Sequence, residues 1–494
     1  MPRKKCIILG CVLVFSLIYA NAEASEKNKK EEYQKYLKEK NEEYHEFEAE
    51  RKNEFERFTE GHWKEFKAFR EESLWQKPKP DIIPKAPDPV EENGKEVGKE
   101  SMETNKSDLS LPIEKVNPDK NIKAEKNILK EDTGNVHLSF FNTPMSFEFH
   151  ESIPRFTASH IDDKKIEEIW SHFSRMDYSA LIAQLRKAQK TYHLNDWGYL
   201  QLLYHVSNRL LPDDKLTRDL FLWFLLQKSG YECKISYLEN GVYLLIPFQE
   251  TLFGFRFIQE GDVKYYYIPF DSSRSLPKKL YSYTGQSPHG RLLATSIEES
   301  PSFAFAEEKK TFRFEYDNES YSIPVTYNKN LIAFLSGYPQ TIIPVYGKAP
   351  AHIEAVVRSL DKIIQGKSEV EQVNIILAFC QKAFTYKTDH DQFGKEKVMF
   401  SEETLFYPYS DCEDRAILFH YLMNRLTHLK TIFIKYPWHL AAAVLFSDSV
   451  TGDKIQYQGK TFLICDPTYT NARAGMSMPQ LKKEKVEVVD IGAF

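Results

Sequence analysis

Three residues near the C-terminal end of the chain have the chemical types of a nucleophile, a general base and a group that orients the base. They are Cys412, His439 and Asp466. The residues around them predict that Cys412 starts a helix, that His439 begins a strand and that Asp466 ends another strand. If the two strands pair antiparallel, the start of one lies beside the end of the other, so the imidazole meets the carboxylate. A helix packed across that edge would bring the thiol to the imidazole.

The predicted helix begins with Ser410-Asp411-Cys412-Glu413, in which Ser410 and Glu413 have the spacing of a capping box. Apolar residues follow at helical spacing, namely Ala416, Phe419, Met423 and Leu426. With Ser410 as the cap, Cys412 lies in the first turn. Unpaired backbone N–H groups and the helix dipole favour a thiolate there, so we expect the pKa of Cys412 to be lowered. They would also stabilise an oxyanion that forms beside the sulfur.

The predicted strands follow directly. Residues 431–436 form one strand, Pro437-Trp438-His439 a turn, residues 440–446 a second strand and residues 460–465 a third, which leads into Asp466-Pro467. Taken alone, His439 is typical of a packed histidine and Asp466 of a turn. Their order after a helical cysteine is what favours a triad.

Three segments together resemble the transglutaminase-like superfamily. They are Ser410-Asp411-Cys412-Glu413-Asp414-Arg415, Tyr436-Pro437-Trp438-His439 and Ile464-Cys465-Asp466-Pro467-Thr468-Tyr469, and Phe384-x-Tyr386 and Glu402-Glu403-Thr404-Leu405 also fit its bacterial branch. The resemblance covers about residues 350–480. It implies a papain-like α+β core with Cys412, His439 and Asp466 as the triad. It also implies that cleavage of amides or peptides is more typical of bacterial members than cross-linking.

The chain departs from a common form of this pattern at two positions. Asp411 precedes the cysteine where many members have Gly, and Trp438 precedes the histidine where Gly or Ala is frequent. Trp438 would narrow the cleft or form the wall of a substrate pocket, or else only pack within the turn. Tyr407 and Tyr409 are further candidates for lining the cleft, with packing in the core as the alternative.

The N-terminal residues predict export. A basic start, an apolar run over 6–20 and Ala20-Asn21-Ala22 together predict a signal peptide, residues 1–22, with a small-x-small cleavage site. The run is too short to cross a membrane, so we expect no span in the mature chain. The location would be periplasmic, at the cell surface or secreted.

Residues 23–75 predict a long charged helix. Aromatic residues recur every eleven positions in two columns, Tyr33, Tyr44, Phe55 and Phe66, and Tyr36, Phe47, Phe58 and Phe69. Eleven residues make three helical turns, so both columns share one face, as in a coiled coil. The stripe over 26–75 would serve self-association or partner binding, or pack on the next domain. Residues 76–135, which carry several prolines and no aromatic residue, predict a disordered linker.

The remaining chain predicts an α+β protein in three parts. Residues 136–295 form an α+β domain, 296–349 a small β segment and 350–494 the catalytic domain. Alignment of Arg218 with Arg415 places Lys215 at the position of Cys412 and Val242 at that of His439, with Asp271 as the late aspartate. Residues 136–295 would then be a degenerate copy of the catalytic domain, although helix–strand–strand order is common in α+β proteins.

Composition excludes several classes of function. The formal net charge of −5, from 66 Lys and Arg against 71 Asp and Glu, argues against a nucleic-acid binder. We find no nucleotide-binding motif and predict no cofactor and no metal. The sequence therefore predicts an exported cysteine hydrolase or acyl transferase that acts on a protein or peptide substrate. The alternative is a non-catalytic binding or scaffold protein of the cell envelope that retains the fold.

Overall fold

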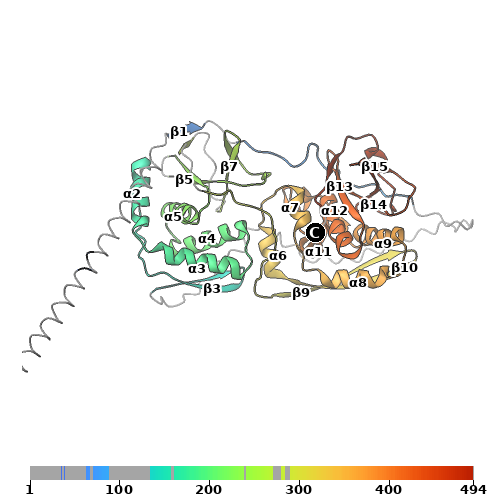
Figure 1. Ribbon diagram of the computed structural model, residues 1–494, viewed down its shortest axis with the longest axis horizontal. Coiled ribbons are helices and arrows are strands. Elements are labelled where there is room, and N and C mark those ends of the chain that lie inside the picture. The colour runs from blue at the N-terminus through green and yellow to red at the C-terminus, as the bar shows by residue number, and fades with distance from the viewer. Residues whose placement is uncertain are drawn as a thin grey trace, which may run out of the picture.

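A computed structural model of the chain describes residues 35, 38, 63–66, 70–87, 134–156, 161–238, 241–270, 280–283 and 290–492. These residues form two lobes that each contain helices and a sheet, so the predicted α+β class is confirmed (Figure 1). The predicted signal peptide, nearly all of the aromatic-striped helix and residues 88–133 lie outside the described residues. No helix in the described part of the chain is long and apolar enough to cross a membrane.

The C-terminal lobe is built on a five-stranded antiparallel sheet in the order β15-β16-β14-β13-β17. Its strands are β13 (Lys430–Lys435), β14 (Leu440–Leu445), β15 (Lys454–Tyr457), β16 (Lys460–Cys465) and β17 (Glu487–Val489). The central strand β14 carries three consecutive alanines, which allow α12 (Cys412–Leu426) to pack closely against it. Because both the sheet and other helices cover α12, its residues from Cys412 to Met423 are all buried.

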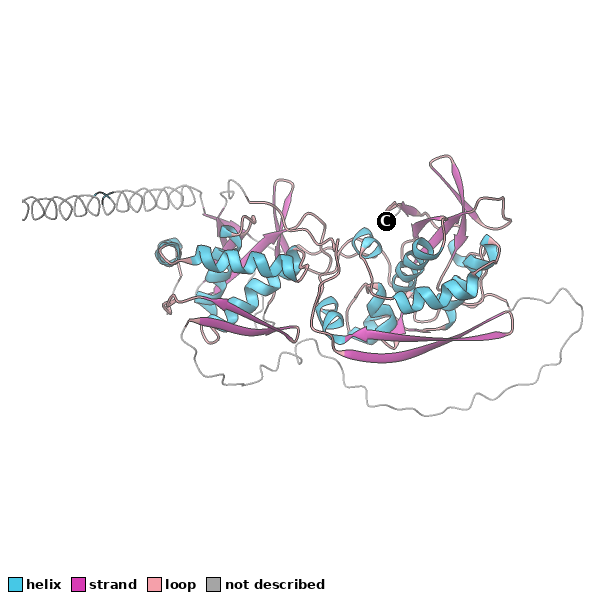
Figure 2. Ribbon diagram, turned by 60° about the horizontal axis from the view of Figure 1, so that its bottom comes forward, coloured by secondary structure: helices cyan, strands magenta, loops and turns pink. Residues whose placement is uncertain are grey.

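Further helices and a long hairpin complete this lobe. Helices α8 (Glu354–Ile364) and α9 (Glu369–Lys382) lie between α12 and the hairpin of β9 (Glu307–Tyr316) and β10 (Glu319–Asn328). The hairpin runs along one edge of the molecule (Figure 2). Shorter elements are β11 (Thr385–Tyr386), which pairs in parallel with β12 (Tyr409–Ser410), then α10 (Asp389–Phe393), α11 (Ser401–Phe406) and a 3-10 turn, Pro479–Leu481.

The N-terminal lobe repeats this arrangement. Its sheet has the order β1-β8-β4-β5-β7-β6, all antiparallel. The elements are β1 (Trp63–Phe66), β2 (Asn135–Phe140), β3 (Thr143–Glu148), α2 (Asp163–Ser174), α3 (Tyr178–Thr191), α4 (Asp196–Leu210), α5 (Lys215–Lys228), β4 (Lys234–Leu238), β5 (Gly241–Pro247), β6 (Phe257–Glu260), β7 (Val263–Tyr267) and β8 (Leu280–Tyr283). Helix α5 packs on β5 as α12 packs on β14, and the β2–β3 hairpin covers α3 and α4.

The two sheets share a strand order, and their residues are matched by aligning the starts of α5 and α12. Helix α5 starts at Lys215 and α12 at Cys412, and alignment of these starts places Leu245 with Ala442. Leu245 pairs with Tyr267, and Ala442 pairs with Cys465. This alignment without gaps places Val242 at the position of His439 and, through the pairing of β5 with β7, Ile268 at that of Asp466. The hairpin before β5 closes at Leu238 and Gly241 and the one before β14 at Lys435 and Leu440, so in this alignment the β4–β5 pairing differs from the β13–β14 pairing by two residues. Asp271 is outside the described residues.

The predicted small β segment, 296–349, is only partly a sheet. The β9–β10 hairpin lies within it, but α6 (Lys329–Ser336) and α7 (Ile343–Lys348) follow the hairpin. The apolar run over 341–345, which we expected to be one of its strands, instead contains the start of α7 at Ile343-Pro344, where proline at a first helical position needs no N–H partner. Since β9 packs on α9, and β10 on α8, the hairpin belongs to the C-terminal lobe.

The N-terminal segment corrects two predictions. Residues 63–66 form β1 at the edge of the N-terminal sheet, so the predicted helix does not extend to 75. Residues 76–87, predicted to belong to a disordered linker, are described and lie along the C-terminal lobe, where Ala86 is buried. Figure 1 shows this segment in blue, crossing from one lobe to the other. Tertiary contacts, rather than local propensity, order it.

Candidate active site

Cys412 is the first residue of α12, and its side chain is 1% exposed. The cap of the helix differs from the predicted one: Asp411 is the N-cap residue, and its backbone N–H donates to Asp414 Oδ2 at 3.1 Å. Ser410 instead accepts a hydrogen bond from Arg415 Nε. Glu413 is thereby free of the capping role, and its carboxylate lies beside the Cys412 sulfur.

His439 and Asp466 form the pair that the strand order predicts. His439 Nε2 lies 2.9 Å from Asp466 Oδ2, and both side chains are almost fully buried. The other carboxylate oxygen of Asp466 accepts hydrogen bonds from the backbone N–H groups of Thr468 and Tyr469. With Nε2–H donating to the carboxylate, Nδ1 carries the free lone pair. Nδ1 is buried, and no described group forms a hydrogen bond with it.

The Cys412 sulfur lies at the same strand end as His439. The backbone N–H of Leu440, the residue after His439, donates to it. The thiol in turn donates to Glu413 Oε2 at 3.1 Å. The structure therefore brings all three predicted triad residues to one edge of the sheet.

The electrostatics of Cys412 differ from the prediction. Burial raises the pKa of the thiol well above its ordinary value, and the Glu413 and Asp411 carboxylates raise it further. Lys79 and the Leu440 N–H act in the opposite direction but do not outweigh these effects. We expected the helix start to lower the pKa of Cys412, and this prediction is wrong for this structure. Desolvation of the thiol and the two adjacent carboxylates raise the pKa by more than the partial positive charge of the helix start lowers it.

A second network joins α12 to the Asp466 loop. The Arg415 guanidinium is buried and donates to the carbonyl oxygens of Gln381 and Phe384. The Gln381 side-chain amide donates to the carbonyl of Asp466 at 2.9 Å. Buried polar groups that are fully paired rigidify their surroundings. This network therefore holds the nucleophile helix and the Asp466 loop in a fixed relation.

An acidic pocket lies next to Cys412, and Lys79 fills it. The Lys79 ammonium lies 2.6 Å from Asp411 Oδ2, 3.3 Å from Asp389 Oδ2 and 2.9 Å from Glu396 Oε2, and also pairs with Glu413 Oε1. The Lys79 side chain is only 2% exposed. Burial acts to lower its pKa, but the surrounding carboxylates raise it well above the ordinary value. These carboxylates are close enough together to hold a metal ion, and here an ammonium group supplies the positive charge.

The segment that carries Lys79 covers the triad. The backbone N–H groups of Gln76 and Lys77 both donate to the Pro437 carbonyl, two residues before His439. Further along, the Pro80 carbonyl accepts a hydrogen bond from the Tyr386 hydroxyl. The Ala86 N–H donates to the Thr470 carbonyl, four residues after Asp466. We call residues 76–86 the strap.

The three predicted cleft residues have different surroundings. Trp438 lies beside His439, with ring centroids 5.5 Å apart, and packs in the apolar cluster that contains Ile83 and Ala86 of the strap. Tyr409 faces Lys387, whose ammonium is 5.0 Å from the ring centroid. Tyr407 is directed elsewhere: its ring packs against Phe393 and Phe406.

Sequence reasoning missed Lys79 and Tyr386 as site residues. Lys79 lies in a proline-rich stretch far from the triad in sequence, and no spacing rule connects the two. Tyr386 belongs to a motif of the family resemblance, yet its hydroxyl contact with Pro80 depends on the strap. Only the tertiary structure brings them to Cys412.

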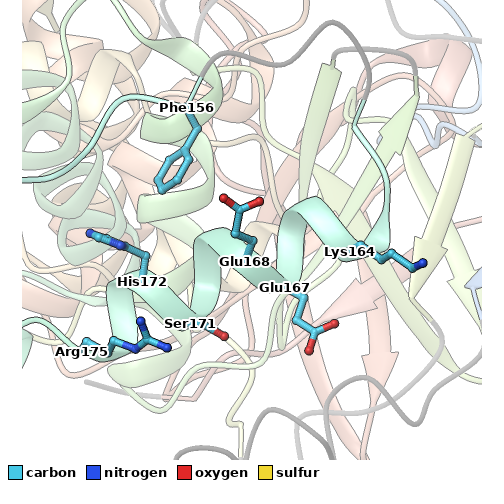
Figure 3. Close-up of a pocket in the computed structure, with 7 residues that line it drawn as sticks. All are labelled: Phe156, Lys164, Glu167, Glu168, Ser171, His172 and Arg175. Carbon is cyan, nitrogen blue, oxygen red and sulfur yellow. The ribbon is translucent and has the colours of Figure 1, made fainter.

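A shallow depression on the outer surface of α2 holds no comparable arrangement. The side chains of α2 around it fan out from the helix instead of converging on one point, as Figure 3 shows. It lies in the N-terminal lobe, whereas the buried carboxylates and the paired histidine lie in the other.

Comparisons with protein-family models, with curated proteins and with solved structures found no match to this chain. The functional argument therefore rests on the geometry described above.

Proposed function

We propose that the C-terminal lobe is a cysteine-dependent hydrolase or acyl transferase that acts on amide bonds of a protein or peptide, in a transglutaminase-like, papain-like arrangement. The observation that carries the proposal is the buried His439–Asp466 hydrogen bond of 2.9 Å at the strand end where the Cys412 sulfur lies. Asp466 holds the histidine in the tautomer whose Nδ1 accepts a proton. Cys412 is a thiol at a helix start, and its sulfur accepts from the backbone N–H of the residue that follows this base, so it is the candidate nucleophile.

The reaction begins with transfer of the Cys412 thiol proton to His439 Nδ1 as sulfur attacks the substrate carbonyl carbon. Backbone N–H groups of the first turn of α12 stabilise the oxyanion. The C–N bond then breaks, and the leaving amine takes the proton from Nδ1. Water or a second amine attacks the thioester, gives its proton to Nδ1 and releases the sulfur, which recovers that proton.

We further propose that residues 136–295 are a degenerate copy of this domain that supports the active one. The shared strand order of the two sheets and the packing of α5 on β5 as α12 packs on β14 support it. A signal peptide at residues 1–22 would place the protein in the periplasm, at the cell surface or outside the cell.

The test uses p-nitrophenyl acetate as an acyl donor. We expect a burst of p-nitrophenolate and an acetyl group on Cys412, located by peptide mass spectrometry. Because Cys412 is 1% exposed, the experiment compares the wild-type protein with an Ala86→Asp variant, in which a charge at a buried position detaches the strap.

Two variants provide the controls. Cys412→Ala removes the acetylated atom, and His439→Ala removes the base while leaving the thiol in place. The proposal requires acetylation of Cys412 that depends on His439. Failure of Cys412 to become acetylated in both the wild-type and the Ala86→Asp proteins would contradict it and favour the scaffold alternative.

A further inference from the structure

The strap contacts the active site on both sides of the triad. Its first hydrogen bonds reach the Pro437 carbonyl beside His439, and its last reaches the Thr470 carbonyl in the loop after Asp466. Between them, no helix or strand is formed, and the backbone bends at 76–77 and at 81–82. Pro78, Pro80 and Pro84 fix their φ angles and so limit the conformations of this segment. A segment without secondary structure that is bound by backbone hydrogen bonds beside His439 and beyond Asp466 has the position of a substrate chain.

The pocket around Lys79 has the chemistry of a specific site for an ammonium group. Its ligands come from three places in the chain: Asp389 in α10, Glu396 in the following loop, and Asp411 with Glu413 at the start of α12. An ammonium group has three donors and fits several separate carboxylate acceptors. Of the four ligands, only Glu396 is substantially exposed.

The pocket needs a positive charge. Burial raises the pKa values of Asp389 and Glu413, and Lys79 opposes this rise for both. Removal of one partner from a buried ion pair leaves an uncompensated charge and is strongly unfavourable. One oxygen of Asp411 is also buried without a hydrogen-bond partner among the described residues. If the strap leaves, the pocket retains acceptors for another ammonium group.

We propose that the strap occupies the groove that binds the substrate chain, and that the pocket filled by Lys79 is the subsite for a lysine-type ammonium group of an extended peptide. The strap then blocks the active site until it is displaced. This inference rests on the proposed function only in assigning the bound chain as a substrate; the binding itself can be measured without turnover.

The first measurement is the rate of Cys412 alkylation by iodoacetamide, followed by mass spectrometry. Ala86→Asp places a charge at a strap position that is 5% exposed, whereas Ile82→Asp changes a strap position that is 83% exposed. We expect alkylation to be at least about tenfold faster in Ala86→Asp than in wild type, and unchanged in Ile82→Asp. Alkylation of Cys380 and Cys465, which are buried away from the strap, reports general unfolding.

The second measurement tests the ammonium subsite in the Lys79→Gln/Ala86→Asp protein, in which the subsite is vacant. A synthetic peptide of residues 75–87 should slow Cys412 alkylation again. The same peptide with norleucine in place of Lys79 should not, because it keeps the alkyl stem and lacks the charge. Binding of both peptides is also measured by calorimetry after Cys412→Ala is added, so that no chemistry of the sulfur contributes.

The outcomes separate the two proposals. Equal alkylation rates in wild type and Ala86→Asp would overturn the strap as a cover, and equal binding of the two peptides would overturn the ammonium subsite. If Ala86→Asp also exposes Cys380 and Cys465, the comparison moves to Lys79→Gln, for which the same rate increase is required. Charge-dependent peptide binding without any acetylation of Cys412 would leave this inference in place and reject the enzymatic one.

Discussion

The two lobes have sheets of the same strand order and differ in what they place at one strand end. At that end the C-terminal lobe holds a cysteine, a histidine and an aspartate, and the N-terminal lobe holds a lysine and two apolar residues. In the alignment without gaps from the two helix starts, the matched pairs are Cys412 and Lys215, His439 and Val242, and Asp466 and Ile268. The fold therefore does not need polar groups at this edge.

This difference between the lobes shows what buried polar side chains at the strand end require. Val242 and Ile268 are each 4% exposed and need no partner, whereas His439 and Asp466 must satisfy each other and the backbone. Lys215 pairs with Asp219 one turn along its own helix, near the surface. Buried polar groups that are costly to hold and that the fold can do without are typical of a functional site.

The largest expected difference between the lobes is the effect of replacing Cys412 in one and Lys215 in the other. We expect Cys412→Ala to reduce turnover of p-nitrophenyl acetate by about 10⁴-fold or more, since loss of a triad nucleophile removes the covalent path. Lys215→Ala should leave the rate unchanged. Both rates are measured in the Ala86→Asp background. A similar loss in both variants would show that the lobes do not differ in this way.

The next substitution concerns the orienting residue. Asp466→Asn keeps the shape but no longer favours the Nδ1 lone pair on His439, so we expect a loss on the order of 10³-fold to 10⁴-fold in turnover. The matched control, Ile268→Leu in the N-terminal lobe, should leave turnover unchanged. Retention of wild-type turnover by Asp466→Asn would contradict the assigned role of the carboxylate.

The helices α12 and α5 also differ in acid sensitivity. His420 of α12 corresponds to Trp223 of α5, and burial lowers the pKa of His420 to about 4. The unfolded chain binds this proton near pH 6.5, so the histidine contributes stability above that pH that is lost as the pH falls towards 4. The loss is about 3 kcal/mol by pH 4. Urea unfolding at pH 7 and pH 4.5 should show a smaller pH dependence in His420→Gln. If the stability of His420→Gln depends on pH as strongly as that of the wild-type protein, His420 is not the source of the acid sensitivity.

The smallest expected effect concerns two glycines of the C-terminal lobe. A Cβ at Gly452, where φ is +147°, would lie 2.5 Å from the Gly475 Cα, so Gly452→Ala should cost about 3 kcal/mol. Gly459 lies in the turn between β15 and β16 and Gly261 in the turn between β6 and β7, and a Cβ at either meets nothing within 4 Å. Gly459→Ala and Gly261→Ala should each cost about 1 kcal/mol, the penalty of a positive φ. Chemical denaturation measures the free energy of unfolding of all three variants. Equal losses of stability would contradict the close approach of Gly452 to Gly475.

The sequence predicted that Cys412, His439 and Asp466 meet at one sheet edge because each residue has a local signal. The helix at Cys412 and the strands that flank His439 and Asp466 follow from apolar periodicity and turn residues, and antiparallel pairing then determines which ends meet. The sequence assigned the capping role to Ser410 instead of Asp411, because both serine and aspartate cap helices. Moving the cap by one residue leaves an acidic residue three positions later, so the capping-box pattern fits either start. The α7 helix was missed because a short apolar run fits a strand equally well.

Local signals failed for the strap and for the electrostatics of the thiol. Residues 76–87 have the composition of a linker, and their order comes from contacts with a lobe more than three hundred positions away in sequence. The pKa of Cys412 depends on burial and on Lys79, neither of which the helix start reveals.

The sequence alone was enough to predict the α+β class and the meeting of Cys412, His439 and Asp466 at one sheet edge, because hydrophobic period and residue order are properties of the chain. The cover over this edge, the place of Lys79 among four carboxylates and the raised pKa of the Cys412 thiol came from the tertiary structure. Solvent exclusion and charge pairing are sums over atoms from distant parts of the chain, and no local pattern contains them.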